Sequence, residues 1–386
     1  MRTRKIAMVA ACPFPQPRGT PIRIYHMASA LARRGHEVSV VTYHLGKSSE
    51  DLPFSIHRIS NVPTYHKTSP GPTYQKLALL DPLLALELRG LLRQESFDVI
   101  HAHHYEGLLV AVAARSRGTP PIVFDVHTLL ESELPYYALG LTRWAKRGIG
   151  RALDRRLPRR ADHLIAVTEQ IRTKLVDEFA VSINRISTIS NGVDHEHFHV
   201  PAKALPVDRE VRTLIFTGNM SAYQGIDLML RAFKIVRDRR DDVRLVIVTE
   251  DSFELYEQLA AGLGVRPFIE VKRSTFDELP AHLAAANIAL NPRVTCDGVP
   301  QKLLNYMAAG RPVVSFDGSA KHLVDGEHGL VVENEDTAAF ACAINRLLND
   351  PKLSRRLGAN GKNFARSRLS WVHTAQQVEA VYDRLL

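Results

Sequence analysis

Short apolar segments alternate with amphipathic segments along the first half of the chain, and this pattern constrains its fold more than any other feature. The apolar run Lys5–Ala10 leads into a proline-rich loop, Cys12–Pro21, and then into Ile22–Arg34, whose apolar residues recur at three- and four-residue steps. That spacing predicts a helix, and Glu37–Thr42 is the next expected strand. Strands that alternate with helices form parallel sheets covered on both faces. Further buried strands are expected at Val99–His101, Ile122–Asp125, Leu164–Val167 and Ile186–Ile189.

The same alternation resumes after a polar stretch, about Asp194–Arg212, which contains Pro201 and Pro206 and is interpreted as an interdomain linker. Two α/β halves of similar size predict two Rossmann-like, doubly wound domains that face a cleft, with ligands bound beyond the carboxyl ends of the strands. The first domain is expected over residues 1–200 and the second over 207–368. The second half is expected to contain strands Thr213–Thr217, Arg244–Val248, Phe268–Val271 and Ile288–Pro292, with helices Gly225–Asp238, Phe253–Leu263, Asp277–Ala286, Glu335–Asn349 and Leu369–Leu386.

The segment 299–314, VPQKLLNYMAAGRPVV, predicts a short helix between a loop and a buried strand. Pro300 suits the first helical turn, where a missing N–H costs nothing, while Gly310 and Pro312 end the helix. Lys302 adds positive charge beside free backbone N–H groups, and that combination favours an anion, most often a phosphate. The alternative is an ordinary strand–helix–strand unit with a basic residue at its helix start.

The composition excludes several classes of protein. Three scattered cysteines do not predict a disulfide framework or a zinc site, so a reducing cytoplasm is expected. The loop after the first strand lacks the glycine fingerprint of nicotinamide-binding proteins. No segment is apolar over the roughly 20 residues of a membrane span. The start Met1–Cys12 imitates a signal peptide, but its apolar run is short and a first buried strand is the preferred interpretation.

The formal net charge of +9, with a pI near 9.5, predicts an anionic partner. The densest basic stretch is Arg143–Arg160, which also contains Trp144. Such a segment can lie on an anionic membrane, and the alternative is a solvated helix face. A nucleic-acid partner is not expected, because no recognition module or aromatic stacking pattern accompanies the charge.

Several segments, in their order and spacing, resemble family 4 glycosyltransferases of the GT-B fold. They are PFPQPRGTPIRIYHMASALARRGHEVSVVT, FDVHT, ADHLIAVTE, ISTISNGVD, LIFTGNMSAYQGIDLMLRAF and GLVVENEDTAAFACAINRLLND, together with the YMAAGRPVV run. The resemblance implies two Rossmann-like domains in GT-B arrangement and transfer of a sugar from a nucleotide-diphosphate sugar with retention at the anomeric carbon. It implies no metal or other cofactor. It also implies that the terminal helix, 369–386, crosses back to the first domain.

The resemblance assigns roles on the first domain. A histidine at the place of His127 lies by the donor sugar and the reacting centre, whereas the alternative is a polar residue that caps a strand end. Gly19 lets backbone approach a phosphate or sugar closely, with a plain turn glycine as the alternative. His103 and His104 are expected to line the acceptor site. The spacing of these two with His101 could suggest a metal, but no complete metal site is evident, and packing at a strand end is preferred.

On the second domain, the resemblance assigns the donor. Asp297 stands one methylene short of the glutamate that meets the donor sugar. Asn305 replaces the glutamate that holds the ribose hydroxyls, and an amide can still bond a diol, without charge assistance. The loop residues Gly298, Val299 and Pro300 complete this part of the donor-binding set.

The pyrophosphate side departs further from the family. Asn219 and Gln224 occupy the places of an arginine and a lysine that usually contact the diphosphate. Both amides can bond phosphate oxygens but add no charge. Lys302 and Arg293 are therefore the expected cations for the leaving diphosphate, with a solvated surface charge as the alternative for Arg293.

The predicted function is a retaining hexosyltransferase-type activity, using a nucleotide sugar and a carbohydrate or lipid-linked acceptor, in surface polysaccharide or glycolipid synthesis. The expected place is the cytoplasm or the inner face of the cell membrane. Two alternatives stay open: a nucleotide-sugar epimerase of the same architecture, and a non-catalytic scaffold that has lost the chemistry.

Overall fold

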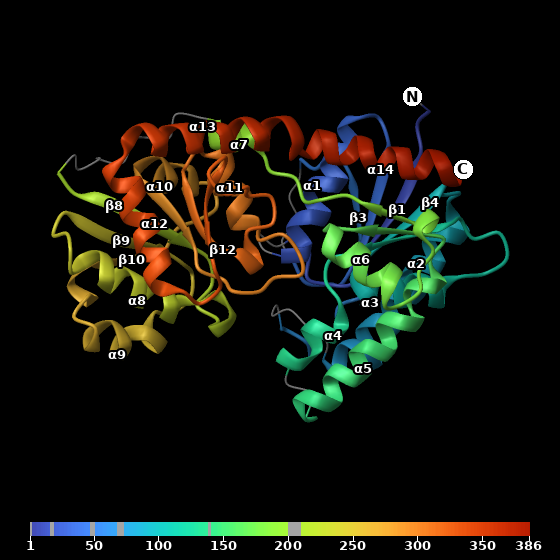
Figure 1. The fold of residues 1–386 in the computed structure, drawn as a ribbon. Coiled ribbons are helices and arrows are strands. Elements are labelled where there is room, and N and C mark those ends of the chain that lie inside the picture. Colours follow the sequence, from blue (N-terminus) through green and yellow to red (C-terminus); the bar gives the residue numbers. More distant parts are fainter. Residues whose placement is uncertain (1, 16–18, 47–50, 68–72, 138–139, 200–209) are drawn as a thin grey trace. The chain divides into compact units, whose positions relative to one another are not determined.

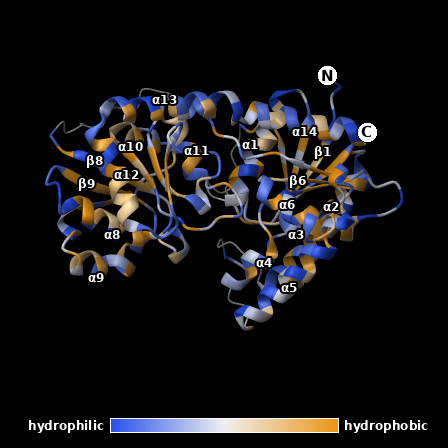
Figure 2. Cartoon of the chain, viewed as in Figure 1, coloured by the Kyte–Doolittle hydropathy of each residue, from blue (hydrophilic) through white to orange (hydrophobic). Residues whose placement is uncertain are grey.

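Two separate parallel sheets organise the chain in the computed structural model (Figure 1), which describes residues 2–15, 19–46, 51–67, 73–137, 140–199 and 210–386. One compact unit comprises residues 1–192 together with 371–386, and the other comprises residues 193–370. Figure 2 shows that apolar residues concentrate on the strands, whereas the outer helices carry both apolar and polar residues.

The first unit contains a seven-stranded sheet in the order β3-β2-β1-β4-β5-β6-β7, with every paired strand parallel. Residues of β1 alternate between two cores, so that Ile6 and Met8 face one and Ala7 and Val9 face the other. A sheet buried on both faces explains why its strands are continuous apolar runs. The strands are β1 Lys5–Ala10, β2 Glu37–Thr42, β3 Ser55–Arg58, β4 Val99–His103, β5 Ile122–Val126, β6 His163–Ala166 and β7 Ile186–Thr188.

Helices cover both faces of this sheet. α1 (Gly19–Arg33) and α14 (Trp371–Leu385) contribute to one core, and α2 (Asp81–Gln94), α3 (His104–Ala114) and α6 (Glu169–Asp177) contribute to the other. The terminal helix packs on α1, and its Glu379 accepts hydrogen bonds from Arg34, the residue after α1, at 2.6 Å from Nε and 2.8 Å from Nη2. Two further helices, α4 (Leu130–Glu133) and α5 (Arg143–Arg156), pack on each other.

The second unit contains a six-stranded parallel sheet in the order β10-β9-β8-β11-β12-β13. Its helices again divide between two cores, with α8, α9 and α12 on one and α10 and α11 on the other. The strands are β8 Arg212–Thr217, β9 Val243–Val248, β10 Ile269–Lys272, β11 Ile288–Asn291, β12 Val313–Phe316 and β13 Gly329–Val332. The helices are α7 His195–His199, α8 Ile226–Arg237, α9 Glu254–Gly262, α10 Leu279–Ala285, α11 Gln301–Ala308, α12 Thr337–Asn349 and α13 Pro351–Arg368.

The predicted fold class, α/β with two Rossmann-like domains, is confirmed. The units divide between residues 192 and 193, earlier than the expected boundary, because α7 groups with the second unit. The expected linker residues Pro201 and Pro206 lie outside the described residues. The elements without a counterpart among the predictions include β3, β13, α13 and α7, and α7 lies within the stretch expected to be a linker. Among the described residues, no helix combines the length and the apolar character needed to cross a membrane.

Candidate active site

An ion pair buried near the carboxyl end of β5 holds a group of histidines together. Asp125, on β5, is fully buried and accepts hydrogen bonds from Arg23 Nε at 2.9 Å and Nη2 at 3.1 Å. Arg23 lies on α1 and also donates to the backbone oxygen of Ile189 at 3.1 Å. Burial by itself would raise the pKa of Asp125, but the adjacent guanidinium charge holds that pKa well below its usual range.

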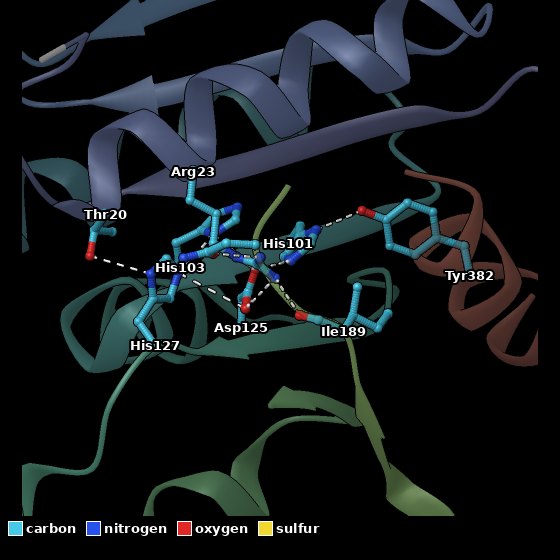
Figure 3. A network of polar contacts seen from close by, with 9 residues as sticks. Thr20, Arg23, His101, His103, Asp125, His127, Ile189 and Tyr382 are labelled. Carbon is cyan, nitrogen blue, oxygen red and sulfur yellow. Dashed lines mark hydrogen bonds and ion pairs between the residues drawn. The ribbon is translucent and has the colours of Figure 1, made fainter. Parts of the chain in front are cut away.

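His127 follows β5 and lies beside the start of α1 (Figure 3). Its Nδ1 is 3.4 Å from Thr20 Oγ1, and its Nε2 is 3.3 Å from His103 Nδ1. Gly19, the first residue of α1, has a positive φ of 58°, and nothing would meet a side chain there within 4 Å. The structure thus brings His127 close to the start of α1, and the roles of both residues stay predictions.

The two other predicted histidines occupy different environments. The ring of His103 is fully buried between Asp125 and His127, and its role on the acceptor side stays a prediction. His104 is partly exposed, with a side chain 15% accessible, and contacts Glu106 and Glu133. Burial opposes its charge, yet these two carboxylates raise the pKa of His104 well above its ordinary value. Its positive φ of 62° makes it a strained non-glycine residue at the β4–α3 junction.

His101, His103 and Asp125 place one possible metal-ligand atom each within 4.8 Å of one another. Arg23 already supplies the positive charge that Asp125 requires, and a metal ion would have to stand beside that guanidinium. His101 is held on its other side, where its Nδ1 lies 2.7 Å from Tyr382 Oη on α14. The geometry therefore fits an ion-paired packing network better than a metal site.

A second group lies in the second unit, at the carboxyl ends of β8 and β11. Lys302, on α11, donates from Nζ to Gln224 Oε1 at 2.6 Å, and Gln224 Nε2 donates to Asn219 Oδ1 at 3.1 Å. Asn219 Nδ2 in turn donates to Tyr223 Oη at 2.8 Å, and the Arg293 guanidinium lies over the Tyr223 ring at 4.8 Å. Four residues predicted for the diphosphate, Asn219, Gln224, Arg293 and Lys302, are therefore brought together.

Lys302 has an unusual environment for a cation. Its ammonium lies 3.8 Å from the centroid of the Phe216 ring, and a side chain at Gly218 would approach it to 3.0 Å. No carboxylate of the described residues forms an ion pair with it. Burial and the nearby Arg293 charge lower the pKa of Lys302 well below its usual range. A cation surrounded by amides and rings is suited to gain an anionic ligand.

The loop and helix that follow place the remaining donor-side residues. Asp297 and Gly298 are half-buried, while Val299 packs into the apolar core with Leu303. A ligand at this loop can therefore contact the backbone of Val299 but not its side chain. Pro300 precedes α11 as its N-cap, one position earlier than predicted, and Asn305 is buried on the same helix. Gly310 ends the helix as predicted, because Gly310 N donates to Met307 O and Arg311 N to Tyr306 O.

Sequence reasoning missed two charged residues near these groups. Arg23 is buried on α1, and nothing in the sequence distinguishes an arginine in a buried ion pair from a surface arginine. Lys321 adopts a strained positive φ of 43° and lies near Cys296 and Asp297, with burial lowering its pKa. The sequence offered no signal for Lys321, because its position depends on the turn after β12.

Comparison with known proteins decides the family. Residues 17–197 match the family model described as Glycosyltransferase Family 4, and residues 211–350 match the model described as Glycosyl transferases group 1. The chain belongs to the family 4 glycosyltransferases. The predicted family is confirmed. The histidines around Asp125 in this glycosyltransferase lie in the region matched by the first model. The Lys302 group, which consists of Asn219, Gln224, Arg293 and Lys302, lies in the region matched by the second.

Curated relatives match this glycosyltransferase over nearly its whole length. A D-inositol 3-phosphate glycosyltransferase from Thermomonospora curvata is 26% identical, over 94% of this chain and 90% of that protein. An MMP alpha-(1->4)-mannosyltransferase from Mycolicibacterium hassiacum is also 26% identical, over 95% of each chain. These similarities support glycosyl transfer as the general activity.

Solved structures share the fold. A sucrose-phosphate synthase from Thermosynechococcus elongatus aligns with a TM-score of 0.80 over 99% of each chain, at 19% identity. The Anabaena protein HepE in complex with UDP-glucose aligns with a TM-score of 0.74, at 16% identity, over 99% of this glycosyltransferase and 100% of that chain. At such identities the likeness shows the fold alone, which is the GT-B fold.

Proposed function

We propose that this glycosyltransferase moves a hexose from a nucleotide-diphosphate sugar to a carbohydrate or lipid-linked acceptor, with retention at the anomeric carbon. The observation that carries the proposal is the Lys302 group, in which a partly desolvated ammonium is held by Gln224 without an acidic partner among the described residues. Arg293 adds a second cation nearby. A nucleoside diphosphate supplies the missing negative charge, and HepE, which shares the fold, is known in complex with UDP and with UDP-glucose.

The protein's work in this reaction is positioning and electrostatic stabilisation. Lys302, Arg293 and the first amides of α11 stabilise the leaving diphosphate, with Asn219 and Gln224 as neutral hydrogen-bond partners. Asp297 and Gly298 meet the donor sugar, and Asn305 contacts the ribose hydroxyls. In the first domain, His127 lies by the donor sugar and the reacting centre, and Gly19 lets the backbone approach a phosphate or sugar closely. The departing phosphate takes the acceptor proton, so no side chain is assigned as a general base.

A product assay tests the retaining chemistry. The protein is incubated with UDP-, GDP- and ADP-linked hexoses and a panel of sugar and lipid-linked acceptors, with and without a metal chelator. Proton magnetic resonance of the new glycoside should show the anomeric configuration of the donor, and the chelator should leave the rate unchanged. Release of a free epimerised sugar would favour the epimerase alternative, and an inverted linkage would contradict retention.

We further propose a place for the reaction at the inner face of the cell membrane, in synthesis of a surface polysaccharide or glycolipid. The support is α5, which turns Gly150 and Asp154 toward α4 and leaves Trp144 exposed at 86%. Arg151 is engaged by Glu131 at 3.2 Å and Glu178 at 3.1 Å. Arg155 and Arg156 are exposed and form no ion pair with another of the described residues, so they are the charges offered to an anionic surface.

Vesicle co-sedimentation tests this contact. Replacing Arg155 and Arg156 together with glutamine should weaken binding to anionic vesicles by roughly 30-fold, since each basic residue near the surface contributes about 1 kcal/mol. Binding should also fade at high salt. The matched control replaces Arg239 and Arg355, exposed arginines of the second unit, in the same way. Equal loss in the control, or equal binding to neutral vesicles, would leave α5 as a solvated face.

A further inference from the structure

A line of close polar contacts runs from α1 to His127 through the interior of the first unit (Figure 3). Arg23 holds Asp125, and Asp125 Oδ2 lies 3.4 Å from His103 Nδ1. The same His103 nitrogen lies 3.3 Å from His127 Nε2. On its far side, His127 presents Nδ1 toward Thr20 Oγ1 at 3.4 Å. Because His103 Nδ1 and His127 Nε2 lie within hydrogen-bond distance, the position of the proton on one ring restricts the position of the proton on the other.

His103 has two unequal nitrogens. Nδ1 faces the carboxylate and His127, whereas Nε2 is buried and has no hydrogen-bond partner among the described residues. Burial lowers the pKa of His103 to about 4, so the ring is neutral at neutral pH and carries one proton. A buried N–H without a partner costs about 1–3 kcal/mol. The proton therefore belongs on Nδ1, beside the Asp125 carboxylate.

This placement determines the state of His127. Its Nε2 must accept the hydrogen bond from His103, and a neutral imidazole that accepts at Nε2 carries its proton on Nδ1. Burial lowers the pKa of His127 well below its ordinary value, which keeps that ring neutral as well. Asp125 Oδ1 is 4.0 Å from His127 Nε2, too far for a hydrogen bond that would favour the opposite tautomer.

We propose that His103 fixes His127 in the tautomer protonated on Nδ1, so that His127 offers a hydrogen-bond donor at the amino end of α1, beside Thr20 and Gly19. His103 is then a positioning residue that acts through His127. If the proposed function holds, His127 donates a hydrogen bond to an oxygen of the bound donor or acceptor, and it does not remove a proton from the acceptor.

Nitrogen magnetic resonance of the full chain tests this inference without any substrate. With ¹⁵N-labelled histidine, long-range proton–nitrogen correlations distinguish a protonated ring nitrogen from an unprotonated one, and a His127→Asn variant identifies the His127 signals. The wild-type protein should show a protonated Nδ1 and an unprotonated Nε2 for His127. A protonated Nε2 would overturn the proposal, whatever the outcome of the transfer assay.

Two variants of His103 test its part. His103→Leu removes the donor, so His127 Nε2 no longer accepts a hydrogen bond and the fraction of His127 protonated on Nε2 should rise. His103→Asn places an amide nitrogen near the position of Nδ1 and should keep the wild-type tautomer. An unchanged His127 spectrum in a folded His103→Leu protein would show that His103 does not fix the tautomer. If His103→Leu fails to fold, the wild-type spectrum and the asparagine variant still decide the proposal.

Discussion

Replacement of Asp125 with leucine should lower the free energy of unfolding of the first domain by about 3–5 kcal/mol. The variant leaves Arg23, whose side chain is 1% exposed, buried without its counter-charge. Removal of one partner of a buried pair costs far more than the pair contributes, because the remaining charge has lost its hydration. Chemical denaturation followed by circular dichroism measures the effect. A matched control is Asp238→Leu, since the exposed pair of Lys234 and Asp238 should contribute only about 0.3–0.5 kcal/mol.

The effect of Asp125→Leu should depend on pH in one direction. The pKa of Asp125 in the folded protein is well below its usual range, so its contribution is fully present above the unfolded value of about 4. It should decline as the pH falls toward the folded value. The stability difference between wild type and variant should therefore be constant from about pH 5 to 8 and shrink in stronger acid. An equal difference across all pH values would contradict the charge account.

Replacement of Lys302 with alanine should lower kcat of transfer by about 10²–10³-fold, which corresponds to about 2.7–4 kcal/mol in the barrier. The ammonium is preorganised by Gln224, and the proposed reaction places the leaving diphosphate beside it. The fold should survive. The lowered pKa of Lys302 means that burial of its charge reduces the free energy of unfolding, so removal of the ammonium should not destabilise the protein. Steady-state kinetics with the donor found in the product assay gives the value.

The control for Lys302 is Lys234→Ala, which removes an exposed lysine of the same unit and should leave kcat unchanged. Near-normal turnover in a folded Lys302→Ala protein would remove this residue from the site. A loss of activity that accompanies a loss of melting temperature would be a folding effect, and Lys302→Met, which keeps the length of the side chain, separates the two.

The parts of the fold that were predictable are those with a repeated pattern. The buried strands Lys5–Ala10 and Glu37–Thr42 have the predicted bounds, because strands covered on both faces are continuous apolar runs. The edge strand Ser55–Arg58 is partly exposed and mixed in composition, so neither an apolar run nor alternation marked it. Helix α13, Pro351–Arg368, is rich in basic residues and glycine, and its helical state depends on packing against α11.

The residues of the candidate site were likewise predictable only in part. Lys302 and Gly310 followed from local rules for helix starts and ends, and the resemblance supplied Arg293, Gln224 and Asn219. The environment of His103 did not follow, because burial of a strand-end residue depends on the helices above it. Arg23 could not be paired with Asp125 from the sequence, since 102 positions separate them. Contacts of that kind require the three-dimensional structure.

Calorimetric titration of nucleoside diphosphates tests most directly the central claim that the Lys302 group binds the donor. We expect the wild-type protein to bind at least one of UDP, GDP and ADP, and Lys302→Met to lose most of that affinity while keeping its melting temperature. Because burial lowers the pKa of Lys302, wild-type affinity should fall with rising pH as Lys302 loses its proton, at a lower pH than an exposed lysine would require. Absence of binding by all three nucleotides, or equal affinity in Lys302→Met, would contradict the account.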